Sequence, residues 1–166
     1  MTSSTPPSTQ FDDCSVFHAE VLATLHVACF VTAWSVKEFK ELLVLPTVFG
    51  FLAHTGNKVP SQTPGQTPEI TGFILCQAVA KECEVLTLGI LPEWRRQGIA
   101  DKMLEAVSRK AEEKGALKMF LEVAENNVPA YGLYATNGFE EVGRRSKYYQ
   151  TLTGPIDALI LTKHIN

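Results

Sequence analysis

The six residues Arg95–Ala100 separate a β-like apolar run from an amphipathic helix, and they constrain the fold more than any other stretch. The run Val85–Leu91 ends at Pro92. Beyond the turn, apolar residues recur at a spacing near 3.6, which predicts a helix over 97–114 that stops at Gly115. A strand, a basic turn and a helix start together form an anion site, because the first helical N–H groups lack internal partners and the helix dipole is positive there.

The turn itself supplies what a phosphate needs. Gly98 lets a phosphate approach the backbone, and Arg95 and Arg96 supply positive charge. This predicts the binding site of a cofactor that carries a pyrophosphate. The alternative that six residues leave open is a tight strand-to-helix connection with solvated arginines. The turn has neither the Gly-Lys-Ser/Thr of the longer phosphate loop nor the acidic residue that reads a ribose.

Length and charge exclude several classes of protein. A chain of 166 residues is expected to form one domain over 11–166, preceded by a disordered Ser/Thr/Pro-rich tail over 1–10. A formal net charge of −3 argues against a nucleic-acid partner, which requires a basic surface. The apolar stretches are too short to cross a bilayer, and the N-terminus does not resemble a signal peptide. The sequence therefore predicts a cytoplasmic protein without a membrane partner.

Cysteine and histidine spacing predicts no metal site. The four cysteines, Cys14, Cys29, Cys76 and Cys83, show no Cys-x-x-Cys spacing, so we expect buried free thiols in a reducing compartment. The four histidines are scattered along the chain, and structural roles are expected for them.

Periodicity along the whole chain predicts a mixed α/β sheet with helices on both faces. A capping box formed by Ser35 and Glu38 begins one short helix. Three proline residues and two glycines predict a flexible hairpin loop over 56–68. The other expected helices cover 17–31 and 129–136, and the expected strands cover 47–54, 70–80, 83–91, 117–124, 139–143 and 158–162.

Glu122 and Tyr134 are candidates for acid–base chemistry. Glu122 points away from its apolar neighbours, near the C-terminal end of the strand that follows the 97–114 helix, where open α/β sheets place ligands. Tyr131 and Tyr134 share one face of the next helix. A solvated carboxylate and core tyrosines are the alternatives, and Tyr131 is assigned to packing.

Two sets of motifs resemble a known family. Arg-x-x-Gly-x-Ala after a strand ending in proline resembles the acetyl-CoA loop of the GNAT N-acetyltransferase superfamily. The series Leu121-Glu122-Val123, Asn126-Asn127, Leu133-Tyr134 and Gly138-Phe139 resembles its RimI-type branch, the ribosomal-protein-alanine N-acetyltransferases. The resemblance extends to Trp34-Ser35, to Arg144-Arg145 with Tyr148-Tyr149 in a loop expected between the last two strands, and to Asp157-Ala158. It implies a GNAT fold, with a central, mostly antiparallel sheet flanked by helices.

The resemblance also implies roles for individual residues. Glu122 would be the general base, acting through a water, and Tyr134 the general acid that protonates the coenzyme A thiolate. Residues implied to contact acetyl-CoA are Leu88, Gly89, Ile90, Arg95, Arg96, Gln97, Gly98, Ile99, Ala100, Asn127 and Tyr134. Residues implied to contact the acceptor are Trp34, Arg145, Tyr148 and Tyr149.

The expected activity is transfer of acetyl from acetyl-CoA, without a metal, to the N-terminal α-amine of a protein, namely the N-terminal alanine of a ribosomal protein. A lysine side chain or a small free amine is the alternative acceptor, and an acetyl-CoA sensor without catalysis is the alternative class. Ala124 stands where the family commonly has arginine, which leaves the peptide specificity open. A monomer or a weak homodimer is expected.

Overall fold

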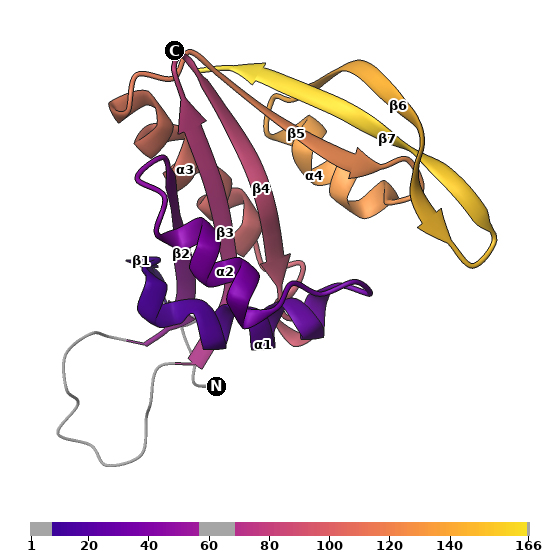
Figure 1. Cartoon of the computed structure of the whole chain (residues 1–166). Coiled ribbons are helices and arrows are strands. Elements are labelled where there is room, and N and C mark those ends of the chain that lie inside the picture. Colours follow the sequence, from indigo (N-terminus) through magenta and orange to yellow (C-terminus); the bar gives the residue numbers. More distant parts are fainter. Residues whose placement is uncertain (1–7, 57–68, 166) are drawn as a thin grey trace, which may run out of the picture. The chain divides into compact units, whose positions relative to one another are not determined.

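The computed structural model describes residues 8–56 and 69–165 (Figure 1). No helix within these two ranges combines the length and the apolar character needed to cross a membrane. Two 3-10 turns, at Val16–His18 and Pro92–Trp94, lie among the longer elements. In chain order the helices and strands are β1 (Thr9–Asp13), α1 (Ala19–Cys29), α2 (Val36–Leu43), β2 (Val48–Thr55), β3 (Glu69–Val79), β4 (Glu82–Ile90), α3 (Ile99–Glu113), β5 (Lys118–Ala124), α4 (Val128–Thr136), β6 (Glu140–Thr151) and β7 (Gly154–His164).

The strands form one seven-stranded sheet in the order β1-β2-β3-β4-β5-β7-β6. The pairs β1–β2, β5–β7 and β6–β7 are antiparallel, whereas β4 and β5 are parallel. A parallel pair needs a long crossover between its strands, and α3 provides it. The mixed sheet predicted from the sequence is confirmed.

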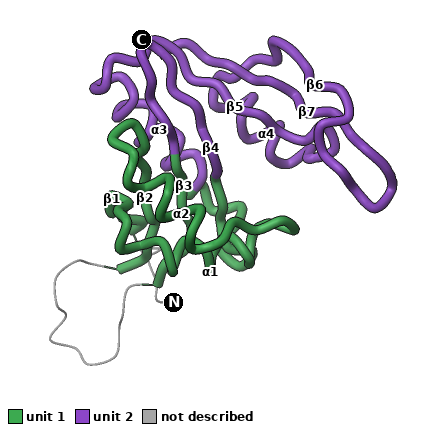
Figure 2. The backbone as a smooth tube through the Cα atoms, viewed as in Figure 1, with its two compact units in different colours: residues 1–75, 88–99 green, residues 76–87, 100–166 purple. Residues whose placement is uncertain are grey.

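The chain forms two compact units, shown in green and purple in Figure 2. Unit 1 contains the residues up to Leu75 together with Leu88–Ile99, and unit 2 contains Cys76–Thr87 together with the residues from Ala100 onward. Strands β3 and β4 therefore contribute residues to both units. The predicted cofactor turn belongs to unit 1 except for its last residue, and the predicted acid–base residues belong to unit 2.

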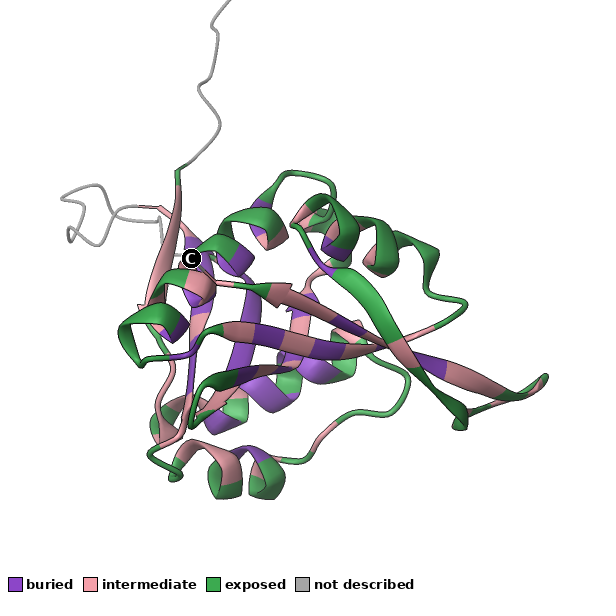
Figure 3. Cartoon of the chain, turned by 90° about the horizontal axis from the view of Figure 1, so that it is seen from above, coloured by how far each residue is buried: buried purple, intermediate pink, exposed green. Residues whose placement is uncertain are grey.

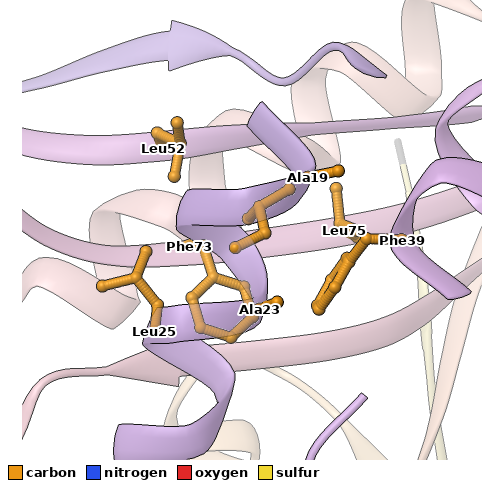
Figure 4. Packing of buried hydrophobic residues seen from close by; sticks show 8 residues of the cluster. Ala19, Ala23, Leu25, Phe39, Leu52, Phe73 and Leu75 are labelled. Carbon is orange, nitrogen blue, oxygen red and sulfur yellow. The ribbon is translucent and has the colours of Figure 1, made fainter. Parts of the chain in front are cut away.

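The core of unit 1 packs α1 and α2 against β2 and β3 (Figure 4). The Ser35 hydroxyl accepts a hydrogen bond from the Glu38 N–H at 3.2 Å, and the Glu38 carboxylate accepts one from the Ser35 N–H at 2.7 Å, which confirms the predicted capping box. This start orients α2 so that Phe39 is fully buried. The buried cluster consists of Ala19, Leu22, Ala23, Leu25, Phe39, Leu52, Phe73 and Leu75.

The core of unit 2 lies between α3 and strands β5 and β7. The apolar face predicted for α3 is confirmed, because Met103, Leu104, Val107 and Ala111 are completely buried. Along β5, buried and half-buried residues alternate, which Figure 3 shows as purple and pink bands along the strands. This alternation leaves Glu122 on the face opposite the buried Met119 and Leu121.

The N-terminal segment departs from its prediction in two places. Thr9 and Gln10, expected in the disordered tail, pair with β2 as part of β1, because their backbone completes the edge of the sheet. The predicted first helix, 17–31, ends at Cys29 rather than at residue 31, and its Val27 is exposed. Residues 1–7 and most of the predicted 56–68 loop lie outside the described residues.

The last two strands are longer than predicted, and this changes the position of the predicted acceptor residues. Arg144, Arg145, Tyr148 and Tyr149 lie within β6, whereas the sequence predicted a loop. β6 is an edge strand with almost every side chain exposed, so it lacks the apolar alternation that identifies a half-buried strand. A register shift between Arg145 and Tyr149 in its pairing with β7 further hides the pattern.

Gly50 in β2 permits a close backbone approach, because a Cβ at this position would overlap the Ile74 carbonyl oxygen and lie 2.7 Å from Leu75 Cδ2. We expect Gly50→Ala to lower the free energy of unfolding by about 1–3 kcal/mol through overpacking. Gly132→Ala is the control, since a Cβ at Gly132 would meet no atom within 4 Å and alanine favours a helix over glycine by about 0.5–1 kcal/mol. Urea unfolding measures both changes, and equal effects would contradict the packing argument.

Candidate active site

The predicted site residues fall into two groups, one in each unit. Unit 1 holds Trp34, the strand end Leu88–Ile90 and the turn Arg95–Ile99. Unit 2 holds Ala100, Glu122, Asn127, Tyr134, Arg145, Tyr148 and Tyr149. Each group has its own geometry and its own chemistry.

The turn before α3 has the backbone of an anion site. Arg96 has φ 61° and Gly98 has φ 75°, so two of its residues adopt the left-handed region. Turns of this kind direct successive N–H groups toward one side, where an anion can accept them. The side chain of Arg96 is exposed, and a Cβ at Gly98 would meet no atom within 4 Å. The residues present therefore fit a pyrophosphate at the N-terminus of α3.

Arg95 is held differently from its neighbour. Its Nε donates a hydrogen bond to the Ile90 carbonyl oxygen at 3.0 Å, and its guanidinium also hydrogen-bonds the Cys29 thiol. Gln97 donates from Nε2 to the Glu93 carbonyl oxygen at 3.2 Å. Arg95 thus links the end of β4 to the end of α1, and its predicted contact with the cofactor stays a prediction.

The end of β4 presents two different faces. Gly89 is buried against Phe73, whose ring lies 2.6 Å from the position of a Cβ on Gly89. Leu88 and Ile90 are half-buried and point the opposite way, because successive residues of a strand alternate. Leu88 and Ile90 thus share one face of the strand end, and their predicted contact with acetyl-CoA stays a prediction.

Tyr134 and Tyr131 lie on α4 but differ in environment. Tyr134 is buried and packs edge-on against the Phe139 ring at 5.7 Å. Burial, with the nearby Cys76 thiol and Tyr149 phenol as smaller causes, raises the pKa of Tyr134 well above its usual value, so its phenol keeps its proton. Tyr131 is 37% exposed, which corrects its assignment to core packing.

Asn127 caps α4. Its side-chain oxygen accepts a hydrogen bond from the Ala130 N–H at 3.3 Å, and Pro129 occupies the first turn as predicted. The structure thus gives Asn127 a clear structural role, and its predicted contact with the cofactor stays a prediction.

Four side chains in unit 2 form an electrostatic cluster around Glu122. Its side chain is 18% exposed, and its Oε1 forms a salt bridge with Arg145, with 2.6 Å between Oε1 and Arg145 Nε. Burial raises the pKa of Glu84, the Glu122 charge adds to the rise, and Arg145 opposes it. Burial also raises the pKa of Tyr149, again with a contribution from Glu122. Two carboxylates, one guanidinium and one phenol therefore influence one another here.

Glu84 is the member of this cluster that sequence reasoning missed. Glu84 on β4 pairs with Phe120 on β5, and Glu122 lies two residues further along β5. Residues two apart share a face of a sheet, so both carboxylates lie on the same face. The available signal was a glutamate in an otherwise apolar run. It became meaningful only with the parallel register, which the sequence does not specify.

The adjacent Arg144 and Arg145 have separate roles. Arg144 pairs with Glu141 at 2.9 Å and with Glu125 at 3.4 Å, away from Glu122. Arg145 lies 5.3 Å from the centre of the Tyr148 ring, and Tyr148 meets Tyr149 edge-on at 5.1 Å. Of the two arginines, only Arg145 contacts predicted site residues in the described part of the chain.

The thiols are free, and those in unit 2 are buried. Cys76 and Cys83 are buried and hydrogen-bond each other, whereas Cys14 and Cys29 are half-buried. Within 8–56 and 69–165, no cluster of three or more histidine, cysteine, aspartate or glutamate side chains is arranged to hold a metal ion.

Comparison with known proteins identifies a family. Residues 20–139 match the model of the acetyltransferase (GNAT) family. A curated relative, the ribosomal protein bS18-alanine N-acetyltransferase of Escherichia coli strain K12, is 29% identical over 116 residues. The match covers 70% of this chain and 78% of the relative.

Solved structures share the fold. The crystal structure of the ribosomal-protein-S18-alanine N-acetyltransferase from Escherichia coli superposes with a TM-score of 0.82 at 23% identity, covering 96% of this chain and 95% of that one. Arabidopsis thaliana NAA60 in complex with acetyl-CoA superposes with a TM-score of 0.81 at 19% identity, covering 96% and 99%. The fold class, the acetyltransferase class and the acetyl-CoA co-substrate predicted from the sequence are thereby confirmed, and the chain belongs to the GNAT acetyltransferase family.

Proposed function

We propose that this enzyme transfers the acetyl group of acetyl-CoA to the N-terminal α-amine of a protein, and that its acceptor is the N-terminal alanine of a ribosomal protein. The observation that carries the proposal is the cluster around Glu122, in which Arg145 holds one carboxylate at 2.6 Å beside Glu84 and Tyr149. The curated relatives add support, because their names specify this acceptor.

The residues of this chain supply binding and proton transfer. Acetyl-CoA brings an activated thioester, so the enzyme needs neither a metal nor a covalent intermediate. The N–H groups of residues 98–100, with Arg96, would hold the pyrophosphate. Glu122, oriented by Arg145, would accept the proton that the amine loses as the new C–N bond forms, directly or through a water. Tyr134, which keeps its proton at neutral pH, would donate it to the thiolate as the C–S bond breaks.

Glu84 gives the site a second place for a proton. Burial raises the pKa of Glu84, the Glu122 charge adds to the rise, and Arg145 opposes it. Glu84 would therefore hold a proton more readily than an ordinary glutamate does.

An α-amine suits this base better than a lysine side chain does. The pKa of a protein α-amino group is about 7.7–8.0, against about 10.4 for lysine. A substantial fraction of α-amines is therefore uncharged at physiological pH, whereas nearly all lysine side chains are protonated. The same proposal places the protein in the cytoplasm, where ribosomal proteins are made, as a monomer or a weak homodimer.

Two peptides test the acceptor. Both begin with Ala-Arg and contain one lysine, and one of them has a blocked N-terminus. We expect mass spectrometry to show one added acetyl group, on the α-amine of the free peptide, and no reaction of the blocked peptide. Acetylation of the lysine in both peptides would replace this proposal with side-chain transfer, and acetyl-CoA binding without any acetylation would favour a sensor.

Gly98→Ala tests the cofactor turn. The substitution adds a methyl group where no protein atom lies within 4 Å, on the turn that the pyrophosphate is proposed to contact. We expect it to raise the Kd for acetyl-CoA by about tenfold or more in calorimetric titration. Gly115→Ala is the matched control, because Gly115 has a similar φ of 86° and also has no neighbour within 4 Å. Both variants should lose about 1–2 kcal/mol of stability through left-handed strain. A normal Kd for Gly98→Ala would remove the turn from the binding site.

Tyr134→Phe tests the general acid. It removes the hydroxyl and preserves the ring that packs against Phe139, so we expect kcat to fall by about 100-fold or more while acetyl-CoA binding is largely unchanged. Tyr131→Phe, on the same helix, should leave kcat near that of the parent. Single-turnover kinetics at saturating peptide measure the step. An unchanged kcat for Tyr134→Phe would assign protonation of the thiolate to another group.

A further inference from the structure

The connection between α1 and α2 depends on one buried imidazole. Residues 30–35 have no regular secondary structure, and they carry the exposed Val31, the partly exposed Phe30 and the half-buried Trp34. His26, on the last turn of α1, is 3% exposed. Trp34 belongs to unit 1 and is predicted to contact the acceptor. The residues that hold Trp34 in place are therefore expected to affect acceptor binding.

Four aromatic rings enclose His26. The Phe30 ring stacks on the imidazole at 4.2 Å with an interplanar angle of 21°, and the Trp34 ring stacks on it at 5.0 Å with 16°. One face of an imidazole holds one ring at such distances, so Phe30 and Trp34 occupy opposite faces. Phe39 of α2 meets the imidazole edge-on at 5.6 Å, and Phe73 of β3 lies at 5.8 Å.

Hydrogen bonds join both ends of the connection to the same residue. The backbone N–H of Phe30 donates to the His26 carbonyl oxygen at 2.9 Å. The backbone N–H of Trp34, not its indole N–H, donates to His26 Nδ1 at 3.1 Å. The second bond requires Nδ1 to be unprotonated, which places the proton of the neutral imidazole on Nε2. The fold therefore specifies one charge state and one tautomer.

The surroundings of His26 favour the neutral imidazole. Burial lowers the pKa of His26, and the Glu38 carboxylate of α2 opposes the shift to a smaller extent. The rings that face His26 from the connection, from α2 and from β3 carry no charge. Glu38 is itself held by the Ser35 N–H at 2.7 Å and by the Ser35 hydroxyl at 2.8 Å, so it is already engaged in capping α2.

We propose that His26 is a positioning residue whose neutral imidazole holds Trp34 and the α1–α2 connection in place for acceptor binding, and whose protonation releases them. This rests on the proposed function, because Trp34 is one of the residues that the family resemblance implies to contact the acceptor. A proton on Nδ1 would face the Trp34 N–H, donor against donor, and the hydrogen bond would be lost. The α1–α2 connection then becomes sensitive to mild acid, and binding of the acceptor weakens without a change in the chemical step.

The direction of the pH effect follows from the pKa. A histidine with a folded-state pKa below its unfolded value, about 6.5, stabilises the fold fully above that value. The stabilisation is lost as the pH falls from about 6.5 through the lowered folded value. The connection is thus ordered at neutral and alkaline pH and loosens as the pH falls through the lowered folded-state pKa of His26.

Fluorescence of Trp34 tests this without any assumption about the substrate. In a Trp94→Phe background, Trp34 is the remaining tryptophan, and protonation of the stacked imidazole should change its emission between pH 8 and pH 5. We expect this transition to be absent in His26→Asn, whose side-chain oxygen can still accept from the Trp34 N–H but does not titrate. His164→Asn, on β7, should keep it. A flat profile in the parent, or a transition that persists in His26→Asn, would overturn the proposal.

Kinetics separate positioning from a merely structural role. His26→Phe keeps an aromatic ring but removes the acceptor, and leaving the Trp34 N–H unpaired should raise the peptide KM by roughly 5- to 100-fold. The kcat at saturating peptide and the KM for acetyl-CoA should stay near the parent values. His26→Asn should restore a lower KM that no longer rises as the pH falls.

Each outcome of the kinetic test bears on one proposal. An unchanged peptide KM in His26→Phe, or a loss confined to kcat, would overturn the role of His26. If no peptide is acetylated even by the parent, the proposed function fails, and the fluorescence titration still decides whether His26 controls the connection. Circular dichroism confirms that each variant is folded before it is compared.

Discussion

Parallel pairing of β4 with β5 is the constraint on which the rest of unit 2 depends. Two parallel neighbours cannot be joined by a hairpin, so the chain must return to the start of β5, and α3 is the return path. That requirement creates a helix N-terminus shortly after β4, where the predicted pyrophosphate-binding turn lies. The same register, Glu84 beside Phe120, brings a second carboxylate to the face that carries Glu122. One pairing thus accounts for the helix start and for the acidic cluster.

The two residues proposed for acid–base chemistry lie in different environments. Glu122 is paired with the Arg145 guanidinium and lies beside Glu84, whose pKa is raised mainly by burial. Tyr134 is buried, which raises the pKa of its phenol, so the phenol keeps its proton at neutral pH. Unit 2 therefore holds a carboxylate paired with a guanidinium and a phenol kept neutral by burial, and the proposed roles of base and acid use this difference.

The strongly periodic parts of the sequence predicted their structures well. The α3 stripe and the β5 alternation are visible because burial on one face imposes a spacing on apolar residues. The α2 capping box is visible because its Ser and Glu lie three residues apart at the helix start. β6 was missed because an edge strand with charged and polar side chains on both faces has no such spacing. Glu84 was missed for another reason, since its importance lies in a register between strands 36 residues apart, which no local pattern records.

The residues predicted to contact the acceptor are thus the ones whose local structure the sequence described least well, and a physical reason connects the two facts. A surface that binds a peptide must be exposed, which removes the burial that produces periodicity. Arg145, Tyr148 and Tyr149 obtain their order from each other and from Glu122 instead. Trp34 obtains its order from His26, a residue buried beneath an irregular segment. In both places, contacts between side chains position these residues, rather than a regular spacing of buried residues along the chain. We therefore expect single substitutions to change acceptor specificity while the fold stays intact.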